Sequence, residues 1–235
     1  AAVEQAVAIV SNPESLDTVI SNRGFHRLLL DGVPVVYKRD DEVIHDHAFV
    51  IDFTDLQANR FRAINQFTIQ GNKQLRRPDI ICFINGLPLA VLELKSHTAE
   101  GVDIWDAFNQ IQTYKDEVPD LFAYNEAVVV SDGYNARVGS LTANQERFMP
   151  WRTLKHEDDK PLLDWQLETM VRGFFDRELF LDYLRYFVIF ETDSEQLIKK
   201  IAGYHQFHAV REAVNATVIA AQSPGQLGQA EKHAT

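Results

Sequence analysis

Residues 76–95 read RRPDIICFINGLPLAVLELK, and the interpretation of the whole chain depends on this stretch. Two short apolar segments flank a turn signal at Asn85-Gly86, so the stretch predicts a β-hairpin. Three charged residues, Asp79, Glu93 and Lys95, lie within this otherwise apolar sequence. Charged side chains are rarely buried without a partner, so their presence here requires a structural or a chemical reason.

The length of the turn decides whether Asp79 and Glu93 can act together. Glu93 and Lys95 are two residues apart, so both project to one face of a strand. A two-residue turn at Asn85-Gly86 would place Asp79 on the face opposite Glu93, whereas a three-residue turn would pair the two residues directly. We therefore predict a three-residue turn or a compensating bulge, with both carboxylates on one face.

Two carboxylates on neighbouring strands can bind Mg²⁺, a hard cation that takes oxygen ligands and retains several waters. Such an ion activates water and orients a phosphodiester for in-line displacement. Lys95 would then hold the attacking water or the scissile phosphate and offset the developing negative charge. The alternative is an ordinary hairpin, in which Glu93 and Lys95 pair at the surface and Asp79 is a turn residue.

The composition is that of a globular protein: of 235 residues, 46% are hydrophobic and 11% are aromatic. This is enough for one large domain with a core, or for one domain and part of another. No apolar run reaches the roughly 20 residues that span a bilayer, and the N-terminus lacks the basic region of a secretory signal. The single Cys82 excludes an intramolecular disulfide. We expect a cytoplasmic protein without a membrane partner.

The net charge of −11 argues against a protein that coats nucleic acid, because phosphate contacts come from Lys and Arg. The argument is incomplete, since charge can be segregated and a metal site beside DNA must itself be acidic. A locally basic segment surrounds the two acids of the hairpin: Arg60, Arg62, Lys73, Arg76, Arg77 and Lys95. For Arg60 and Arg62 taken alone, a solvated charged surface explains the pattern equally well.

Hydrophobic periodicity predicts an α/β core around the hairpin. Apolar residues at 3–4 spacing predict a helix over residues 102–118 that begins near Asp103. Short apolar strands are predicted at residues 63–69, 127–131 and 136–141. Strand, helix and strand in this order favour a mixed sheet with a helical crossover.

The segments outside this core have mixed signals. Residues 25–54 are interpreted as β-structure, preceded by a short helix that Ser15 or Asp17 would cap. Residues 164–187 and two pieces of residues 194–221 are predicted to be helical.

His45 and His47 alternate with Asp46 in the predicted β-segment, so the two histidines would share one face. One interpretation of this pattern is a metal site. We favour the alternative of a solvent-exposed hairpin edge, because no second group of ligands stands nearby in the sequence.

Pro78-Asp79 followed by Glu93-Leu94-Lys95 resembles the core motif of PD-(D/E)xK nucleases, and Gln110-x-x-x-Tyr114 resembles the helix motif of the RecB-like branch. The phrases NGLPLAVLELK, FNQIQTYK and LFAYNEAVVVSDG are similar to the restriction (R, HsdR) subunit of type I restriction-modification enzymes over most of the chain. The resemblance implies a restriction-endonuclease-like mixed sheet flanked by helices, with an N-terminal β-rich extension and a C-terminal helical segment.

The resemblance also implies roles for particular residues. The implied catalytic residues are Asp79, Glu93, Lys95, Gln110 and Tyr114. Asp79, Glu93 and the backbone carbonyl of Leu94 would bind Mg²⁺. Gln110 and Tyr114 would support the site or contact the DNA backbone, since positions i and i+4 share a helix face. Tyr114 is equally interpretable as a core residue.

Residues 200–214, KIAGYHQFHAVREAV, resemble the adenine-recognising Q motif of superfamily 2 translocases, with Gln206 as the implied contact to ATP. A packing helix is the alternative. No GxxxxGK[ST] phosphate loop occurs, so ATP would serve a longer subunit of which this is the N-terminal portion. The implied order is an endonuclease domain with its extension over 1–151, a linker and helical segment over 152–193 and the start of a translocase domain over 194–235.

As a whole, the resemblance implies the Mg²⁺-dependent endonuclease portion of a type I restriction enzyme. It would hydrolyse phosphodiester bonds of unmodified double-stranded DNA after ATP-driven translocation, with methylation (M) and specificity (S) subunits as partners. The acidic ligand that the family usually supplies from an N-terminal helix is unassigned, and Glu4 is the only acid in the first helical run. Two alternatives are another RecB-like nuclease of repair or recombination, and a degenerate nuclease fold that serves as a docking module.

Overall fold

The computed structural model of the chain describes residues 2–71, 74–96, 98, 100–156, 159 and 165–222. Lys73 of the basic segment and the C-terminal residues 223–235 lie outside the described residues. The α-helices are α1 (Ala2–Val10), α2 (Thr18–Asp31), α3 (Ile104–Glu117), α4 (Pro119–Phe122), α5 (Gln166–Thr169), α6 (Arg177–Tyr186) and α7 (Tyr204–Gln222). The strands are β1 (Val33–Arg39), β2 (Glu42–Ala48), β3 (Phe61–Asn65), β4 (Ile69–Gln70), β5 (Leu75–Arg76), β6 (Ile80–Ile84), β7 (Leu87–Leu94), β8 (Ala127–Ser131), β9 (Ala136–Gly139), β10 (Val188–Asp193) and β11 (Gln196–Ile201).

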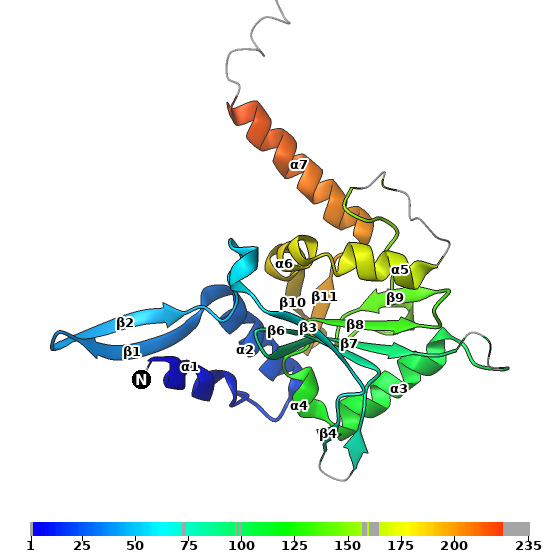
Figure 1. Cartoon of the computed structure of the whole chain (residues 1–235), viewed down its shortest axis with the longest axis horizontal. Coiled ribbons are helices and arrows are strands. Elements are labelled where there is room, and N and C mark those ends of the chain that lie inside the picture. Colours follow the sequence, from blue (N-terminus) through cyan, green and yellow to red (C-terminus); the bar gives the residue numbers. More distant parts are fainter. Residues whose placement is uncertain are drawn as a thin grey trace, which may run out of the picture.

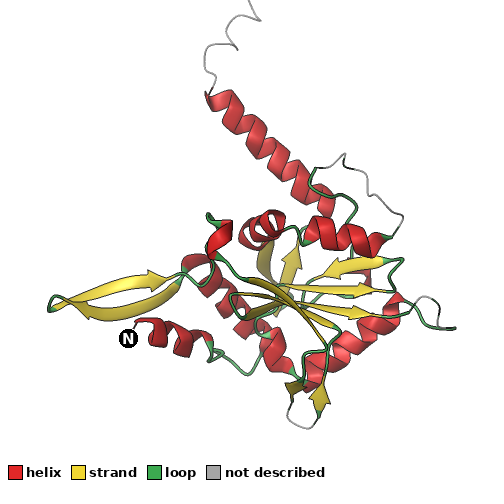
Figure 2. Ribbon diagram, in the orientation of Figure 1, coloured by secondary structure: helices red, strands yellow, loops and turns green. Residues whose placement is uncertain are grey.

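The centre of the molecule is a five-stranded mixed sheet in the order β3-β6-β7-β8-β9 (Figure 2). Strands β7 and β8 are parallel, and the other neighbouring pairs are antiparallel. A parallel pair requires a crossover connection, and α3 and α4 lie on the connection between β7 and β8 (Figure 1). The predicted α/β fold, with a mixed sheet flanked by helices, is therefore confirmed.

Side chains alternate along β7 between the two faces of the sheet, and each face packs against a different hydrophobic cluster. Val91 belongs to the cluster that contains Ile111 of α3. Its neighbours Ala90 and Leu92 belong to the cluster that contains the buried residues of α6. Because side chains alternate along a strand, Glu93 continues the row of Val91 and projects to the face covered by α3.

Helix α3 forms where the sequence predicts it. Asp103 is the N-cap: its Oδ1 accepts a hydrogen bond from the N–H of Trp105 (2.7 Å), and Oδ2 of Asp106 accepts one from the N–H of Asp103 (2.9 Å), which completes a capping box. The buried residues follow the predicted 3–4 spacing, namely Ile104, Ala107, Ile111 and Tyr114. The same helix therefore covers the sheet and carries the predicted Gln110-x-x-x-Tyr114 motif.

Several predictions of local structure are wrong. Residues 49–54, expected to be β-structure, follow the end of β2, and residues 66–68, inside the expected strand 63–69, separate β3 from β4. Residues 25–31, expected to be β-structure, form the second half of α2. Phe25 and Leu29 are buried one helical turn apart, and an apolar run this short does not distinguish a period of 3.6 from one of 2. Residues 196–201, expected to be helical, form β11 and pair antiparallel with β10. The cap of α2 was predicted correctly as one of two alternatives, since the Asp17 side chain accepts hydrogen bonds from two N–H groups of the first turn.

Strands β1 and β2 form a separate two-stranded hairpin that projects from the body (Figure 1). Its turn consists of Asp40 and Asp41, both with positive φ (50° and 65°). His45 and His47 are exposed on β2. No three His, Cys, Asp or Glu side chains gather as a metal site anywhere in the described part of the chain. The structure therefore supports the exposed hairpin edge.

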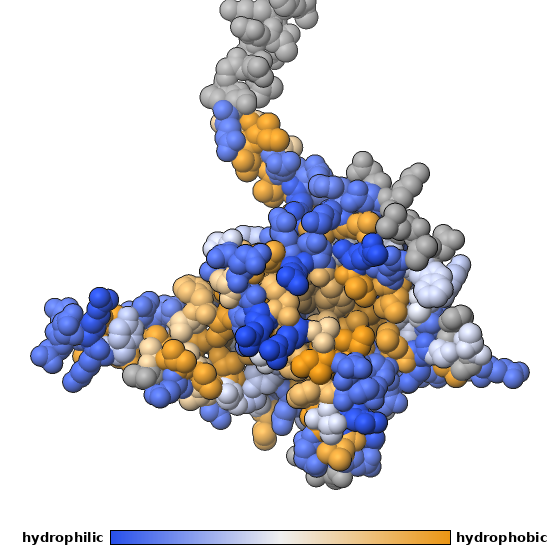
Figure 3. All heavy atoms as spheres, in the orientation of Figure 1, coloured by the Kyte–Doolittle hydropathy of each residue, from blue (hydrophilic) through white to orange (hydrophobic). Residues whose placement is uncertain are grey.

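Helix α7 confirms the predicted C-terminal helical segment and extends away from the sheet (Figure 1). It exposes apolar side chains along its length, namely Val210, Val214, Val218 and Ile219. Figure 3 shows apolar surface on this helix. Even so, none of the helices in the described ranges combines the length and apolar character needed to cross a membrane.

Candidate active site

The hairpin of β6 and β7 contains both a short turn and a bulge. The turn has two residues, Asn85 and Gly86, with φ of 52° and 90°, so the three-residue turn is wrong. Ile84 pairs with Leu87 beside this turn, and the register then shifts by one residue between Cys82 and Phe83. The extra residue lies in β7. This is the compensating bulge predicted as the alternative to a longer turn, and that prediction is confirmed.

The bulge restores the register that the two carboxylates require. Beyond it, Ile80 pairs with Leu92. The next residues outward are Asp79 and Glu93, which therefore lie opposite each other and share one face of the sheet. Without the shift, Glu93 and Lys95 would face away from Asp79.

Glu93 is a buried carboxylate, with only 4% of the residue exposed. Its Oε1 accepts a hydrogen bond from Nζ of Lys95 at 3.2 Å, and its Oε2 has no hydrogen-bond partner among the described residues. Burial raises the pKa of Glu93, and the charge of Asp79 raises it further; Lys95 opposes both effects. The Glu93 carboxylate is therefore harder to ionise than an exposed one, and its Oε2 is available to bind a ligand.

Asp79 is held by hydrogen bonds on both carboxylate oxygens. Its Oδ2 accepts from the N–H of Leu94 at 2.8 Å, and its Oδ1 accepts from Nε2 of Gln66 at 2.8 Å. The N–H of Gln66 also donates to the Asp79 carbonyl at 2.9 Å, and Gln66 itself has a positive φ of 53°. Sequence reasoning missed Gln66, because nothing in the local pattern connects it with a residue thirteen positions later. The bond to Leu94 brings the main chain of the predicted carbonyl ligand beside Asp79.

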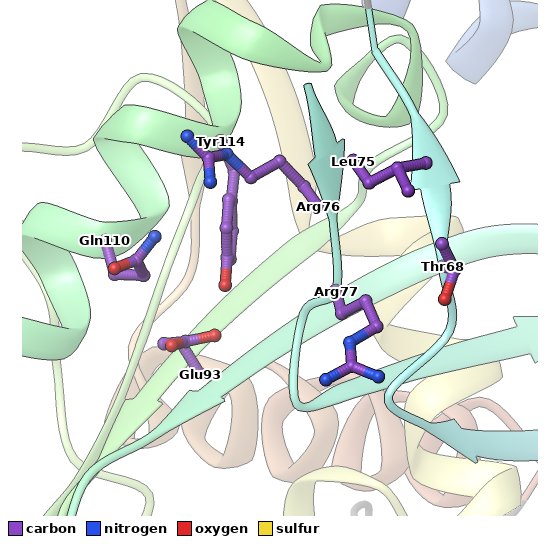
Figure 4. A pocket seen from close by; sticks show the side chains of 7 residues that line it. All are labelled: Thr68, Leu75, Arg76, Arg77, Glu93, Gln110 and Tyr114. Atoms are coloured by element: carbon purple, nitrogen blue, oxygen red, sulfur yellow. The ribbon is translucent and has the colours of Figure 1, made fainter.

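Gln110 and Tyr114 of α3 face the hairpin from above the sheet, and Figure 4 shows the Tyr114 hydroxyl directed toward Glu93. Tyr114 is 5% exposed and belongs to the α3 hydrophobic cluster, so it is a core residue, and its role in the site stays a prediction. Burial raises the pKa of Tyr114, and the neighbouring charge of Glu93 adds to the effect. The hydroxyl therefore stays protonated and can act as a hydrogen-bond donor at neutral pH.

These side chains line a pocket of about 370 Å³ (Figure 4). The lining residues are Thr68, Leu75, Arg76, Arg77, Glu93, Gln110 and Tyr114. Glu93, Gln110 and Tyr114 were predicted as site residues. Thr68 and the two arginines reach the pocket through the segment around β4 and β5, a placement that the sequence did not predict. Asp79 and Lys95 adjoin the pocket through their contacts with Leu94 and Glu93.

The other candidate residues lie elsewhere. Gln206 is exposed in the first turn of α7, where its Oε1 accepts a hydrogen bond from the N–H of Gly203 at 2.9 Å. This contact is a helix cap, and the role in adenine recognition stays a prediction. Glu4 lies on α1, which packs against β1 rather than beside the pocket. The N-terminal acidic ligand is still unassigned.

The donor set of the site fits a hard divalent cation. The buried Oε2 of Glu93 makes no hydrogen bond with the described residues, Asp79 lies on the same face, and the Leu94 main chain is adjacent. Within the described residues no third acidic, His or Cys side chain completes the set. The remaining ligands would therefore be a backbone carbonyl, water or the substrate. Such a ligand set suits Mg²⁺, which keeps several waters, better than it suits metals that protein side chains coordinate completely.

Comparison with known proteins agrees with this geometry. The model of the family described as type I restriction enzyme R protein N terminus (HSDR_N) matches residues 2–147. The chain belongs to this family. It is 44% identical over 228 residues to the type I restriction enzyme HindI endonuclease subunit of Haemophilus influenzae, covering 95% of the chain and 22% of that relative.

A second relative is the putative type I restriction enzyme MjaIXP endonuclease subunit of Methanocaldococcus jannaschii, 30% identical over 89% of the chain and 21% of its own length. The EcoprrI endonuclease subunit of Escherichia coli is 27% identical over 69% of the chain and 55% of the relative. The chain therefore corresponds to the N-terminal region of type I R proteins, and it spans about a fifth of the length of the first two relatives.

Proposed function

We propose that this chain is the nuclease portion of a type I restriction enzyme and that it hydrolyses phosphodiester bonds of unmodified double-stranded DNA with the help of Mg²⁺. The observation that carries the proposal is the bulge of the β6–β7 hairpin. It places Asp79 and Glu93 on one face, beside Lys95 and beneath Gln110 and Tyr114. Membership of the type I R protein family supports the same activity.

In this mechanism Asp79, Glu93 and the carbonyl of Leu94 would hold the metal ion. When bound, Mg²⁺ supplies an activated water and neutralises charge on the phosphate. Lys95, whose Nζ already lies 3.2 Å from Glu93, donates hydrogen bonds to the attacking water and stabilises the transition state. Gln110 and the protonated hydroxyl of Tyr114 orient the phosphate or its water from the opposite wall.

The wider activity belongs to the same proposal. ATP-driven translocation would come from a motor domain, with Gln206 contacting the adenine of ATP and M and S subunits completing the complex. Residues 1–151 would carry the nuclease, 152–193 the linker and helical segment, and 194–235 the start of the translocase. Support comes from the relatives, each of which is described as an endonuclease subunit of a type I restriction enzyme.

Of the two alternatives, family membership argues against a separate repair nuclease. A docking module without activity would have no need of a buried carboxylate beside a second acid, an arrangement that burial and like charge both disfavour. The intact set of Asp79, Glu93 and Lys95 therefore favours catalysis.

The test is cleavage of an unmodified plasmid by the complete enzyme carrying Asp79→Ala, Glu93→Ala or Lys95→Ala. Each change should reduce cutting at least about a hundredfold, because each removes a metal ligand or a charge at the reacting phosphate. ATP hydrolysis should continue, since the changes leave the motor intact. Glu146→Ala, at an exposed position outside the pocket, is the control. Normal cutting by the Lys95 variant would overturn the mechanism.

A further inference from the structure

The candidate site faces an electrostatic difficulty. The chain has a net charge of −11, and two acids, Asp79 and Glu93, lie where a DNA phosphate must approach. A polyanion is attracted only where cationic side chains are available. The question is which cations around the pocket are free to take a phosphate.

Among the described residues, three cationic side chains border the site, and two of them already have partners. Nζ of Lys95 donates to Glu93 at 3.2 Å. Arg76 forms a two-point ion pair with Glu117 of α3, with Nη2 and Oε1 2.6 Å apart. Arg77 is exposed and makes no hydrogen bond or ion pair with any residue that the structure describes.

The local sequence explains why the two arginines behave differently. Arg76 ends β5, and consecutive residues of an extended chain project in opposite directions. The ring of Pro78 confines the preceding residue, Arg77, to an extended conformation, and Pro78 itself is buried. Arg76 therefore turns to Glu117, and Arg77 turns away from it.

Figure 4 shows the result: the guanidinium of Arg77 lies on the wall of the pocket opposite Glu93, on the same side as Thr68. The Tyr114 hydroxyl faces Glu93 from the other wall. A group held by Arg77 would thus lie across the pocket from the Glu93 carboxylate.

We infer that Arg77, with the hydroxyl of Thr68, forms a phosphate subsite that binds the DNA backbone next to the bond to be cut. This inference rests on the proposed nuclease function and extends it to substrate capture. A guanidinium suits the task because its planar fork donates two hydrogen bonds to one phosphate. Arg76 contributes by tying β5 to α3, which positions the segment from which Arg77 extends.

The experiment compares Arg77→Lys, Arg77→Ala and Arg77→Glu in the complete enzyme. Plasmid cutting is measured at two Mg²⁺ concentrations, one below saturation and one saturating. Arg77→Ala should slow cutting about 10- to 100-fold, the range for the loss of a charge-assisted contact. Lys should retain part of the rate, and Glu should be slower than Ala. Extra Mg²⁺ should not restore cutting, and ATP hydrolysis should be unchanged. Arg27→Ala, at an exposed position on α2 outside the pocket, is the control.

Equal rates for the Ala and Glu variants would overturn the inference, because a phosphate contact must respond to the sign of the charge. So would recovery of the Ala variant at saturating Mg²⁺, which would indicate a weakened metal site instead. Glu93→Ala is measured alongside. If it abolishes cutting while Arg77→Ala cuts normally, the subsite is wrong and the nuclease function stands. If Glu93→Ala cuts normally, the proposed function itself fails.

Discussion

At the scale of single residues, the candidate site contains a carboxylate, Glu93, whose surroundings oppose its ionisation. Glu93 is buried beside Asp79, and this raises its pKa above the usual value of 4.5. The folded protein therefore holds this proton more tightly than the unfolded chain does. The resulting stability is present at low pH and is lost as the pH rises through 4.5 toward the raised folded value.

We expect Glu93→Gln to make the metal-free chain more stable than the wild type at neutral pH and no more stable at low pH, because an amide carries no charge to bury. Thermal unfolding between pH 4 and pH 8 measures the difference. Mg²⁺ should raise the melting temperature of the wild type and leave that of the variant unchanged. Glu146→Gln, at an exposed position, is the control. A variant less stable than the wild type at pH 7 would show that pairing with Lys95 outweighs burial.

We expect Gln66 to act by positioning Asp79, the proposed metal ligand. Its side chain donates to Oδ1 of Asp79 at 2.8 Å. Removing such a partner of a metal ligand commonly weakens metal binding 10- to 100-fold. Gln66→Ala should therefore raise the Mg²⁺ concentration needed for half-maximal plasmid cutting by about tenfold, with near-normal cutting at saturation. Gln70→Ala, which removes only a bond to the neighbouring Gly71 carbonyl, is the matched control. A lowered maximal rate with an unchanged Mg²⁺ requirement would contradict the assignment.

At the scale of elements, the sheet is joined to the C-terminal hairpin by a buried ion pair. Nζ of Lys199 on β11 lies 2.7 Å from Oε2 of Glu126, and both side chains are fully buried. The same ammonium also donates to Asn22 of α2 and to the carbonyl of Asn125. Burial opposes ionisation of Glu126, but the charges of Lys199 and His26 outweigh it and lower the pKa of Glu126. Three segments distant in sequence are thereby held together.

Lys199→Met should destabilise the chain by about 3–5 kcal/mol, because it leaves Glu126 charged and buried without its principal partner. Urea unfolding measures the loss. The double variant Lys199→Met with Glu126→Leu should recover much of the stability, since paired removal leaves no uncompensated charge. If the double variant were as unstable as the single one, packing rather than charge would explain the effect.

At the scale of the whole molecule, one hydrophobic cluster extends from the sheet to α7. Trp151, at the end of the expected nuclease region, packs against Phe174, Tyr183 and Phe207. The helical segment and the start of α7 are thus seated on the face of the sheet opposite α3. This packing covers one face of the sheet, and α3 covers the other (Figure 1). The pocket lies on the α3 side and is lined by Gln110 and Tyr114 of this helix.

The sequence by itself determined the α3 helix and the main strands of the sheet, and it singled out Asp79, Glu93 and Lys95 as candidate site residues. These follow from local periodicity, from a capping residue at Asp103 and from residue types, all of which are readable within a few positions. Only the tertiary structure decided the rest. Residues 25–31 became helix because the packing of Phe25 and Leu29 selected one of two periods.

The site shows the same division. Both a three-residue turn and a bulge satisfy the spacing of the carboxylates, and the pairing of β6 with β7 selected the bulge. Arg76 and Arg77 are neighbours of the same type in the sequence, yet Glu117, 41 positions from Arg76, binds only Arg76, and Arg77 has no ion-pair partner in the part of the chain that the structure describes. Gln66 reaches Asp79 only because β3 pairs with β6. Contacts between distant segments depend on the packing free energy of the whole fold, which no local pattern contains.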